Sequence, residues 1–295
     1  MPNSYLRKRF HLDKSIFPWH SNPYGAQDFV PVDPKLHSKL GVSKGAKIHV
    51  FAGYYGNWAH ALAEGSKRVR YTDASKDFTD FARKQSVRNV SYKTIAAELA
   101  PIRKNAFDWS FSFEPFPLLG HKGIGSVVSR ALLNRKGLKV LFSDRERERG
   151  RALIDSIKFV GEVYGAKMKT EKVELDTTKT SDKLNNTITF PRMHEFTVIT
   201  LLTNPLAREK AAFDLKVQNI VDKAIKKTNP QSYGRASPLL STKRDASIKR
   251  THLKDFEFAS SLGPVLAKQL KISPKTVKES LVRLKKLAEL YERVN

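Results

Sequence analysis

The sequence contains no cysteine, and methionine accounts for only 3 of its 295 residues. Without thiols the chain cannot form disulfides, cysteine-ligated zinc sites or iron–sulfur clusters, and it cannot use thiol catalysis. It also lacks an apolar run of about 18 residues, so we expect no transmembrane helix and no membrane partner. The basic segment Met1–Phe10 is not followed by an apolar stretch, so we expect no secretory signal and predict a cytoplasmic protein.

Acidic residues are also scarce. The chain has 29 Asp and Glu against 54 Lys and Arg, giving a formal net charge of +25 at pH 7. A charge of this size predicts attraction to a polyanion, either a nucleic acid or an anionic membrane surface. Hydrophobic residues make up 40% of the chain, enough for a core, so disorder of the whole chain is excluded. The length suggests two domains.

Residues 1–46 are expected to form an irregular N-terminal arm, because several prolines interrupt it and proline disfavours regular structure. Aromatic residues lie between these prolines, and they either pack against the following domain or form a lid over a ligand. The prolines are Pro18, Pro23, Pro31 and Pro34, and the aromatic residues are Phe17, Trp19, Tyr24 and Phe29.

Residues 47–205 alternate between strand-like and helix-like segments, which predicts an α/β domain with right-handed βαβ units on a mainly parallel sheet. The expected strands are Lys47–Ala52, Arg68–Thr72, Asn89–Thr94, Phe107–Phe113, Leu138–Phe142, Lys172–Leu175 and Glu195–Leu202. The expected helices are Asn57–Glu64, Lys76–Gln85 and Arg147–Tyr164, and the polar residues 176–186 are expected to form a loop.

A glycine-containing turn, Phe51–Trp58, connects the first expected strand to the first helix. Gly53 and Gly56 allow a tight turn and a close approach of the backbone to a ligand at the helix N-terminus. Asp73 ends the second strand, 20 residues after Gly53, where doubly wound folds place an acid that binds ribose hydroxyls. Alternatively, this turn only closes a βα connection.

The motifs Ala52–Gly56 and Tyr71–Ala74 resemble those of class I S-adenosylmethionine-dependent methyltransferases, a resemblance that covers about residues 47–205. It implies a Rossmann-like sheet of seven strands with S-adenosylmethionine bound across the first two. The implied cofactor-binding residues are Ala52, Gly53, Tyr54, Gly56, Asp73 and Ala74, with the methionine part at the turn and the ribose at Asp73.

The segment Glu114-Pro115-Phe116 follows the fourth expected strand and resembles the polar–proline–aromatic segment of nucleic-acid amino methyltransferases. The resemblance implies that Glu114 and a neighbouring carbonyl accept hydrogen bonds from the target amine. Phe116 or Phe113 would then stack on an extruded base. The alternative is a proline-rich turn that packs both phenylalanines into the core.

Residues 206–250 are expected to comprise the helix Ala207–Lys227 and a basic linker, and residues 251–295 to form a helix-turn-helix domain. In the second helix of this motif, Ser273 is a good N-cap and Pro274 suits the first helical position. The motif resembles the helix-turn-helix of archaeal and bacterial regulators, whose second helix enters a major groove. The residues expected to point inward are Val277, Leu281 and Leu284. The residues expected to point outward are Lys275, Thr276, Lys278 and Ser280.

The predicted nucleic-acid contacts of this motif are Lys268, Lys271, Lys275, Thr276, Lys278 and Arg283. The alternative is a small helical bundle used for packing or dimerisation. Two functions therefore stay open. One is an S-adenosylmethionine-dependent methyltransferase acting on DNA or RNA. The other is a DNA-binding regulator or architectural protein whose Rossmann-like domain is catalytically silent. The histidines lack metal-ligand spacing, so we expect no metal site.

Overall fold

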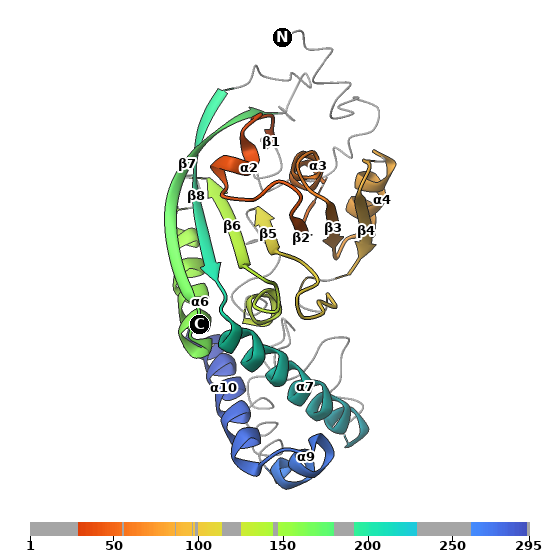
Figure 1. Ribbon diagram of the computed structural model, residues 1–295, viewed down its shortest axis with the longest axis vertical. Helices are drawn as coiled ribbons and strands as arrows, with labels where there is room; N and C mark the ends of the chain where they lie inside the picture. The colour runs from red at the N-terminus through yellow and green to blue at the C-terminus, as the bar shows by residue number, and fades with distance from the viewer. Residues whose placement is uncertain are drawn as a thin grey trace.

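The computed structural model describes residues 29–54, 56–85, 87–95, 97, 100–113, 125–143, 147–179, 192–228 and 261–293. The described strands form one sheet in the order β1-β7-β8-β6-β5-β2-β3-β4 (Figure 1). Strands β2 to β6 pair in parallel, whereas β8 is antiparallel to β6 and β7, and β1 is antiparallel to β7. The strands are β1 (Phe29–Pro31), β2 (Lys47–Phe51), β3 (Arg68–Asp73), β4 (Val90–Thr94), β5 (Trp109–Phe113), β6 (Gly137–Ser143), β7 (Lys167–Lys179) and β8 (Arg192–Leu202).

Helices cover both faces of this sheet, so its central strands are buried on both sides. Every residue of β5 and β6 is buried, although β5 alternates aromatic residues with serines and β6 contains Lys139. The helices are α2 (Leu36–Lys39), α3 (Asn57–Ala63), α4 (Lys76–Lys84), α6 (Arg147–Tyr164), α7 (Pro205–Thr228), α9 (Gly263–Leu270) and α10 (Pro274–Arg293). Residues 125–131 are also helical.

All seven strands predicted from the sequence are present, but the described residues form a sheet of eight strands and not the implied seven, because β1 joins it beside β7. Two further expectations need correction. Strand β7 extends to Lys179, so residues 176–179 are not a loop; Asp176 and Thr177 pair with β8, and residues 177–179 pair with β1. Part of the N-terminal arm is also regular, since Phe29–Pro31 forms β1 and Leu36–Lys39 forms α2. Pro31 is tolerated at this position because β1 is an edge strand.

Helix α10 packs on α7, α6 and α9 at the end of the molecule opposite β1 and α2 (Figure 1). Leu266 of α9 and Val277 of α10 belong to the same apolar cluster as Ile157 of α6. The inward prediction for the α10 residues is confirmed, because Val277, Leu281 and Leu284 are buried. Ser280 was expected to point outward, but it is fully buried; it lies one helical turn before Leu284 on the packed face.

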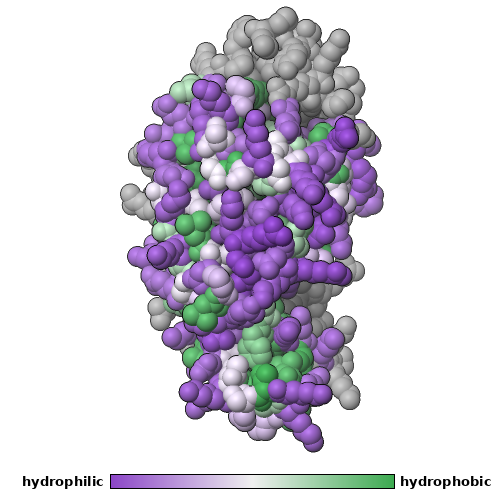
Figure 2. Space-filling model, in the orientation of Figure 1, coloured by the Kyte–Doolittle hydropathy of each residue, from purple (hydrophilic) through white to green (hydrophobic). Residues whose placement is uncertain are grey.

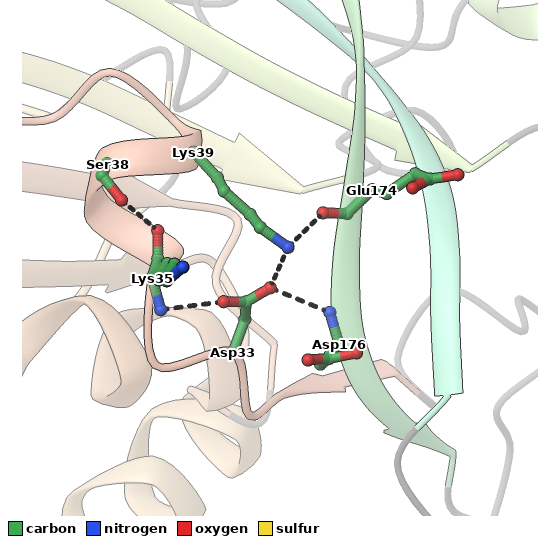
Figure 3. Close-up of polar contacts among 6 residues, drawn as sticks. All are labelled: Asp33, Lys35, Ser38, Lys39, Glu174 and Asp176. Carbon is green, nitrogen blue, oxygen red and sulfur yellow. Dashed lines mark hydrogen bonds and ion pairs between the residues drawn. The ribbon is translucent and has the colours of Figure 1, made fainter.

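A buried carboxylate fastens the arm to the sheet (Figure 3). Asp33 accepts hydrogen bonds from the backbone N–H groups of Lys35 (2.8 Å) and Asp176 (3.1 Å), and its ion pair with Lys39 measures 2.7 Å. Lys39 also donates to the carbonyl of Glu174. Burial alone would raise the pKa of Asp33, but the hydrogen bonds from Lys39, Asp176 and Lys35 outweigh it and hold the pKa below its ordinary value.

We expect Asp33→Asn to lower the free energy of unfolding by about 2 kcal/mol at pH 7, because hydrogen bonds to a charged group are lost. The contribution of Asp33 is present above the ordinary carboxyl pKa and disappears as the pH falls through the lowered native value. Urea unfolding of both proteins should therefore differ at pH 7 and converge in acid. Lys39→Met should lower the free energy of unfolding by less than Asp33→Asn does, because Lys39 is partly exposed and Asp33 keeps its hydrogen bonds from the backbone. An equal loss in acid and at pH 7 would contradict this account.

Candidate functional site

The strand order changes direction at β2. From β2 the chain adds β3 and β4 on one side, and then β5 and β6 on the other. Open α/β sheets bind ligands in the crevice outside the carboxyl ends of their strands at such a switch point. The carboxyl ends of β2, β3 and β5 therefore define the candidate site, and the sequence motifs at residues 52–56, 73–74 and 114–116 follow directly on these three strands.

The turn after β2 has an unusual backbone. Ala52 and Tyr54 both have a φ of 48°, and Gly56 has a φ of 86°. Non-glycine residues rarely adopt this left-handed conformation, and such residues gather at ligand-binding and active sites. The turn is fixed by its own contacts, because the Tyr71 hydroxyl donates a hydrogen bond to the Tyr54 carbonyl.

The two glycines of the turn are required by protein packing. A Cβ at Gly53 would overlap the ring of Tyr71, and one at Gly56 would lie 2.8 Å from His60 and 2.9 Å from Ala82. Among the described residues, the space beside the two glycines is therefore filled by protein side chains, namely those of Tyr71, His60 and Ala82. This finding favours the interpretation of the glycines as packing residues, while the left-handed Ala52 and Tyr54 on either side of Gly53 keep the ligand interpretation open.

Asp73 ties the turn to the end of β3. Its carboxylate accepts a hydrogen bond from the Tyr54 N–H at 3.0 Å and another from the Ser75 N–H at 2.8 Å. Burial raises the pKa of Asp73, and hydrogen bonds from the N–H groups of Ser75, Tyr54 and Ala74 hold it down only in part. The side chain is 1% exposed, although Ala74 beside it is exposed. The structure thus brings Ala52, Gly53, Tyr54, Asp73 and Ala74 together.

The end of β5 brings a second group to the same edge. Phe113, its last residue, stacks on Trp58 of α3 with ring centroids 4.4 Å apart and also contacts Phe196 of β8. Phe113 is therefore a core residue and not a base-stacking one, because its ring is buried between these two. Glu114, Pro115 and Phe116 come next in the chain and lie outside the described residues.

Trp58 is a residue that the sequence analysis missed. Its indole Nε1 is buried and, among the described residues, has no hydrogen-bond partner. Buried donors are normally satisfied, so an unsatisfied one beside a ligand crevice suggests a missing acceptor. The sequence feature that could have identified Trp58 is its position, two residues after Gly56, in the first turn of a helix that follows a glycine-containing loop.

Of the predicted nucleic-acid contacts of the helix-turn-helix motif, five are exposed and one, Arg283, is bound within the protein. Ser273 caps α10, accepting from the Thr276 N–H at 3.2 Å, and Lys271 forms the turn with a φ of 54°. Arg283 instead donates two hydrogen bonds, at 2.8 and 2.7 Å, to the buried Asp214 of α7, which assigns it a structural contact. The exposed residues are Lys268, Lys271, Lys275, Thr276 and Lys278.

The described part of the chain lacks two kinds of site. It holds no group of three His, Asp or Glu side chains placed to bind a metal ion. None of its helices combines the length and the apolar character that a membrane span requires.

Comparison with solved structures finds methyltransferases at low similarity. A SAM dependent methyltransferase from Aquifex aeolicus has 14% identity and a TM-score of 0.41, over 59% of this chain and 91% of its own. The tRNA (m1A58) methyltransferase TrmI from the same organism has 16% identity and a TM-score of 0.41, over 58% and 67%. Magnesium protoporphyrin IX methyltransferase from Synechocystis, with bound SAH, has 11% identity and a TM-score of 0.38, over 55% and 75%.

No protein-family model matches the sequence, and no curated protein matches it. TM-scores near 0.4 and identities of this size establish neither a shared ligand nor a shared activity. The chemistry of the site therefore has to be judged from its own residues.

Proposed function

We propose that the chain is an S-adenosylmethionine-dependent methyltransferase that acts on a nucleic acid. The observation that carries this proposal is the convergence, at the switch point of the sheet, of a strained turn and a carboxylate. Ala52 and Tyr54 hold left-handed conformations in the turn, and Asp73 reaches that turn from the neighbouring strand. Doubly wound folds bind nucleosides at this switch point, with an acid at the end of the neighbouring strand on the ribose.

The residues fit the cofactor in the chemistry of their donors and acceptors. A carboxylate has about four lone-pair positions, and the backbone N–H groups of Tyr54, Ser75 and Ala74 use three of those of Asp73, so one stays available to a ribose hydroxyl. Trp58 offers an indole N–H that the described residues leave without an acceptor. Because Asp73 is 1% exposed, binding of a ribose to it requires the residues that cover the carboxylate to move.

S-adenosylmethionine, when bound, supplies a methyl group activated by its sulfonium. The proposed task of the chain is to hold and orient both partners, since positioning alone can lower such a barrier substantially. Asp73 binds the ribose hydroxyls, and the turn at Ala52–Tyr54 borders the cofactor. Glu114 accepts hydrogen bonds from an acceptor amine, and Phe116 stacks on the base that carries it.

The substrate class follows from charge. The net charge of +25 favours a polyanion, and the exposed lysines of α9 and α10 suit contacts with phosphates. Lysine contacts of this kind position a nucleic acid and specify little of its sequence. We place Lys268, Lys271, Lys275 and Lys278 in this role and leave out Arg283, whose guanidinium is bound to Asp214.

A second candidate function is a DNA-binding regulator or architectural protein with a silent Rossmann-like domain. The packing of the turn favours it, because the ring of Tyr71 takes the space beside Gly53 and Asp73 is buried. The two candidates differ in one measurable property, which is affinity for S-adenosylmethionine.

Titration calorimetry with S-adenosylmethionine tests the proposal. We expect the wild type to bind and Asp73→Ala to bind about 10-fold or more weakly, given about 1.5 to 3 kcal/mol for hydrogen bonds to a charged group. Asp33→Asn is the matched control, because it also removes a buried carboxylate that accepts backbone N–H bonds, but at the arm. If the wild type does not bind the cofactor at millimolar concentration, the enzyme proposal is refuted and the regulator is favoured. If Asp73→Ala and Asp33→Asn bind the cofactor with equal affinity, the proposed role of Asp73 is refuted.

A further inference from the structure

The edge of the sheet opposite the candidate crevice is rich in basic residues. Parallel strands begin at the same edge, so the residues that precede or open β2, β3, β4, β5 and β6 are brought together there. We call this surface the amino edge. Its basic residues are Lys44, Lys47, Lys67, Arg68, Arg70, Arg88, Arg103, Lys104, Arg135, Lys136 and, at the start of α7, Arg208.

Hydrogen bonds between the loops give this edge a fixed shape. The Asp108 N–H donates to the carbonyl of Lys47, and the Lys136 N–H donates to the carbonyl of Asp108. Arg208 of α7 donates to the carbonyls of Asn134 and Arg135 at 3.0 and 2.7 Å. The basic side chains therefore project from a braced backbone.

Acidic residues do not balance this charge. Glu209 is paired with Lys104, and Asp108 lies 3.8 Å from Arg135 while it also accepts from the Lys47 N–H. Glu64 is the remaining acid among the described residues that border these strands. Exposed basic side chains thus outnumber the acids along the whole edge.

Arg70 shows how closely these charges approach one another. Its guanidinium lies 4.9 Å from the centre of the Phe107 ring and donates to the Pro101 carbonyl. Burial lowers the pKa of Arg70, and the like charges of Arg68 and Arg103 lower it further. Like charges held together raise the free energy of the folded protein, so a bound anion at this place would relieve a repulsion.

The amino edge is large enough for a polyanion. Adjacent strands are about 4.8 Å apart, so β4 to β6 spans roughly 19 Å. A DNA duplex carries one phosphate charge per roughly 1.7 Å of its axis, which gives about eleven charges over that span. Several phosphates could therefore face this edge at once.

The amino edge lies at the same end of the sheet as α7, α9 and α10, whereas the carboxyl ends of β2, β3 and β5 face the other way (Figure 1). Hydrophilic side chains gather across the middle of the visible face, over the lower ends of the central strands and the start of α7 (Figure 2). Surface contacts made at the amino edge would thus continue toward the lysines of α9 and α10.

We propose that the amino edge binds the phosphate backbone of a nucleic acid, as a surface separate from the helix-turn-helix lysines and from the cofactor crevice. This inference rests on the nucleic-acid partner of the proposed function and not on methyl transfer. A nucleic acid held here would have to reach around the sheet to present a base at the crevice, which favours a folded or long partner over a short one.

The test compares salt-dependent binding of a labelled DNA duplex of roughly 20 base pairs, and of the RNA duplex of the same sequence, between about 50 and 200 mM salt. Arg68→Gln, Arg103→Gln and Lys136→Gln are combined in one variant. We expect its affinity at about 100 mM salt to fall 10-fold or more. The log–log slope should fall by about 2 to 3, because each lost phosphate contact removes about 0.9.

A control variant combines Lys76→Gln, Lys93→Gln and Lys158→Gln, which removes the same charge from exposed positions away from this edge. It should retain the wild-type slope to within about one unit. If the first variant folds poorly by circular dichroism, Lys44→Gln with Lys67→Gln and Lys136→Gln tests the same surface through other exposed side chains.

The outcomes separate this inference from the proposed function. Equal slopes for the amino-edge variant and the control would overturn the inference and leave the proposed function intact. Wild-type protein that binds neither duplex would overturn both claims about nucleic acid, whatever calorimetry shows for the cofactor. Tighter binding to phosphatidylserine vesicles than to either duplex, lost in the amino-edge variant, would make this a membrane-binding surface and would overturn the inference.

Discussion

Arg283→Met is expected to lower the free energy of unfolding by about 3 to 5 kcal/mol, the range for breaking a buried ion pair by removing one partner. Asp214 of α7 is 1% exposed and Arg283 of α10 is 15% exposed, so both charges are largely removed from water. The two hydrogen bonds between them are bidentate and span the interface that attaches α10 to α7. Loss of the guanidinium leaves the carboxylate buried without its counter-charge.

The pKa of Asp214 defines how the variant would respond to pH. Burial raises this pKa, and hydrogen bonds and charge from Arg283 lower it in part. In Arg283→Met the pKa should rise further, so the native state should take up a proton that the unfolded state has released at neutral pH. A raised carboxyl pKa makes stability fall as the pH rises. The variant should therefore lose less stability at pH 5 than at pH 7.

A double variant, Asp214→Leu with Arg283→Met, is the decisive control. Replacing a buried pair by apolar groups is often neutral, so the double variant should recover most of the stability that the single one loses. Urea unfolding followed by circular dichroism measures the whole chain, and hydrogen exchange measures α10 alone. A loss below about 1 kcal/mol for Arg283→Met, the size of a surface ion pair, would show that this contact does not hold α10 in place.

The sequence predicted the central strands well because their segments are rich in the aromatic and aliphatic residues that favour strands. The β5 and β6 segments are buried at every position, and their predicted ends differ from the observed ends by two residues or fewer. The strand segments that the sequence analysis missed are extended because of the strands they pair with. β1 has only three residues, and residues 176–179 are polar, so neither segment carries a strand pattern of its own. β1 is extended because β7 lies beside it. Residues 176–179 are extended because β8 pairs with Asp176 and Thr177, and β1 pairs with residues 177–179.

The candidate site was predictable in position but not in its packing. The order of strand, glycine turn and acid placed Gly53 and Asp73 at one edge, because parallel strands end together. Which side chain lies against a glycine depends on the neighbouring strand, so the contact of Tyr71 with Gly53 could not be foreseen. Arg283 was assigned to phosphate as a residue of the predicted helix-turn-helix motif. Its partner Asp214 is 69 residues away in the chain, and local sequence carries no record of such a pair.

His49 is expected to give the protein a steep loss of stability in acid. It lies in β2, three residues before the left-handed Ala52, and it is 1% exposed. Its Nε2 lies 2.9 Å from the Thr72 hydroxyl, and Phe107 packs against the ring. Burial, with a smaller contribution from the charge of Arg70, lowers the pKa of His49 from 6.5 to about 3.

The direction of the effect follows from proton uptake. Below pH 6.5 the unfolded chain binds a proton at His49, whereas the native protein does not until about pH 3. Stability conferred by the neutral imidazole is therefore complete above pH 6.5 and decreases as the pH falls toward 3. At pH 4 the loss amounts to roughly 3 kcal/mol, from about 1.4 kcal/mol for each pH unit.

His49→Gln isolates this contribution, because glutamine keeps a polar group near Thr72 but does not titrate. Urea unfolding of both proteins at pH 7 and pH 4 gives two differences, and subtracting them cancels the titration of Asp33, Asp73 and Asp214. We expect the variant to be less stable than the wild type at pH 7 and to lose roughly 3 kcal/mol less on moving to pH 4. Parallel losses in the two proteins would mean that His49 is protonated in the native state at pH 4, and that the core beneath the candidate site admits water.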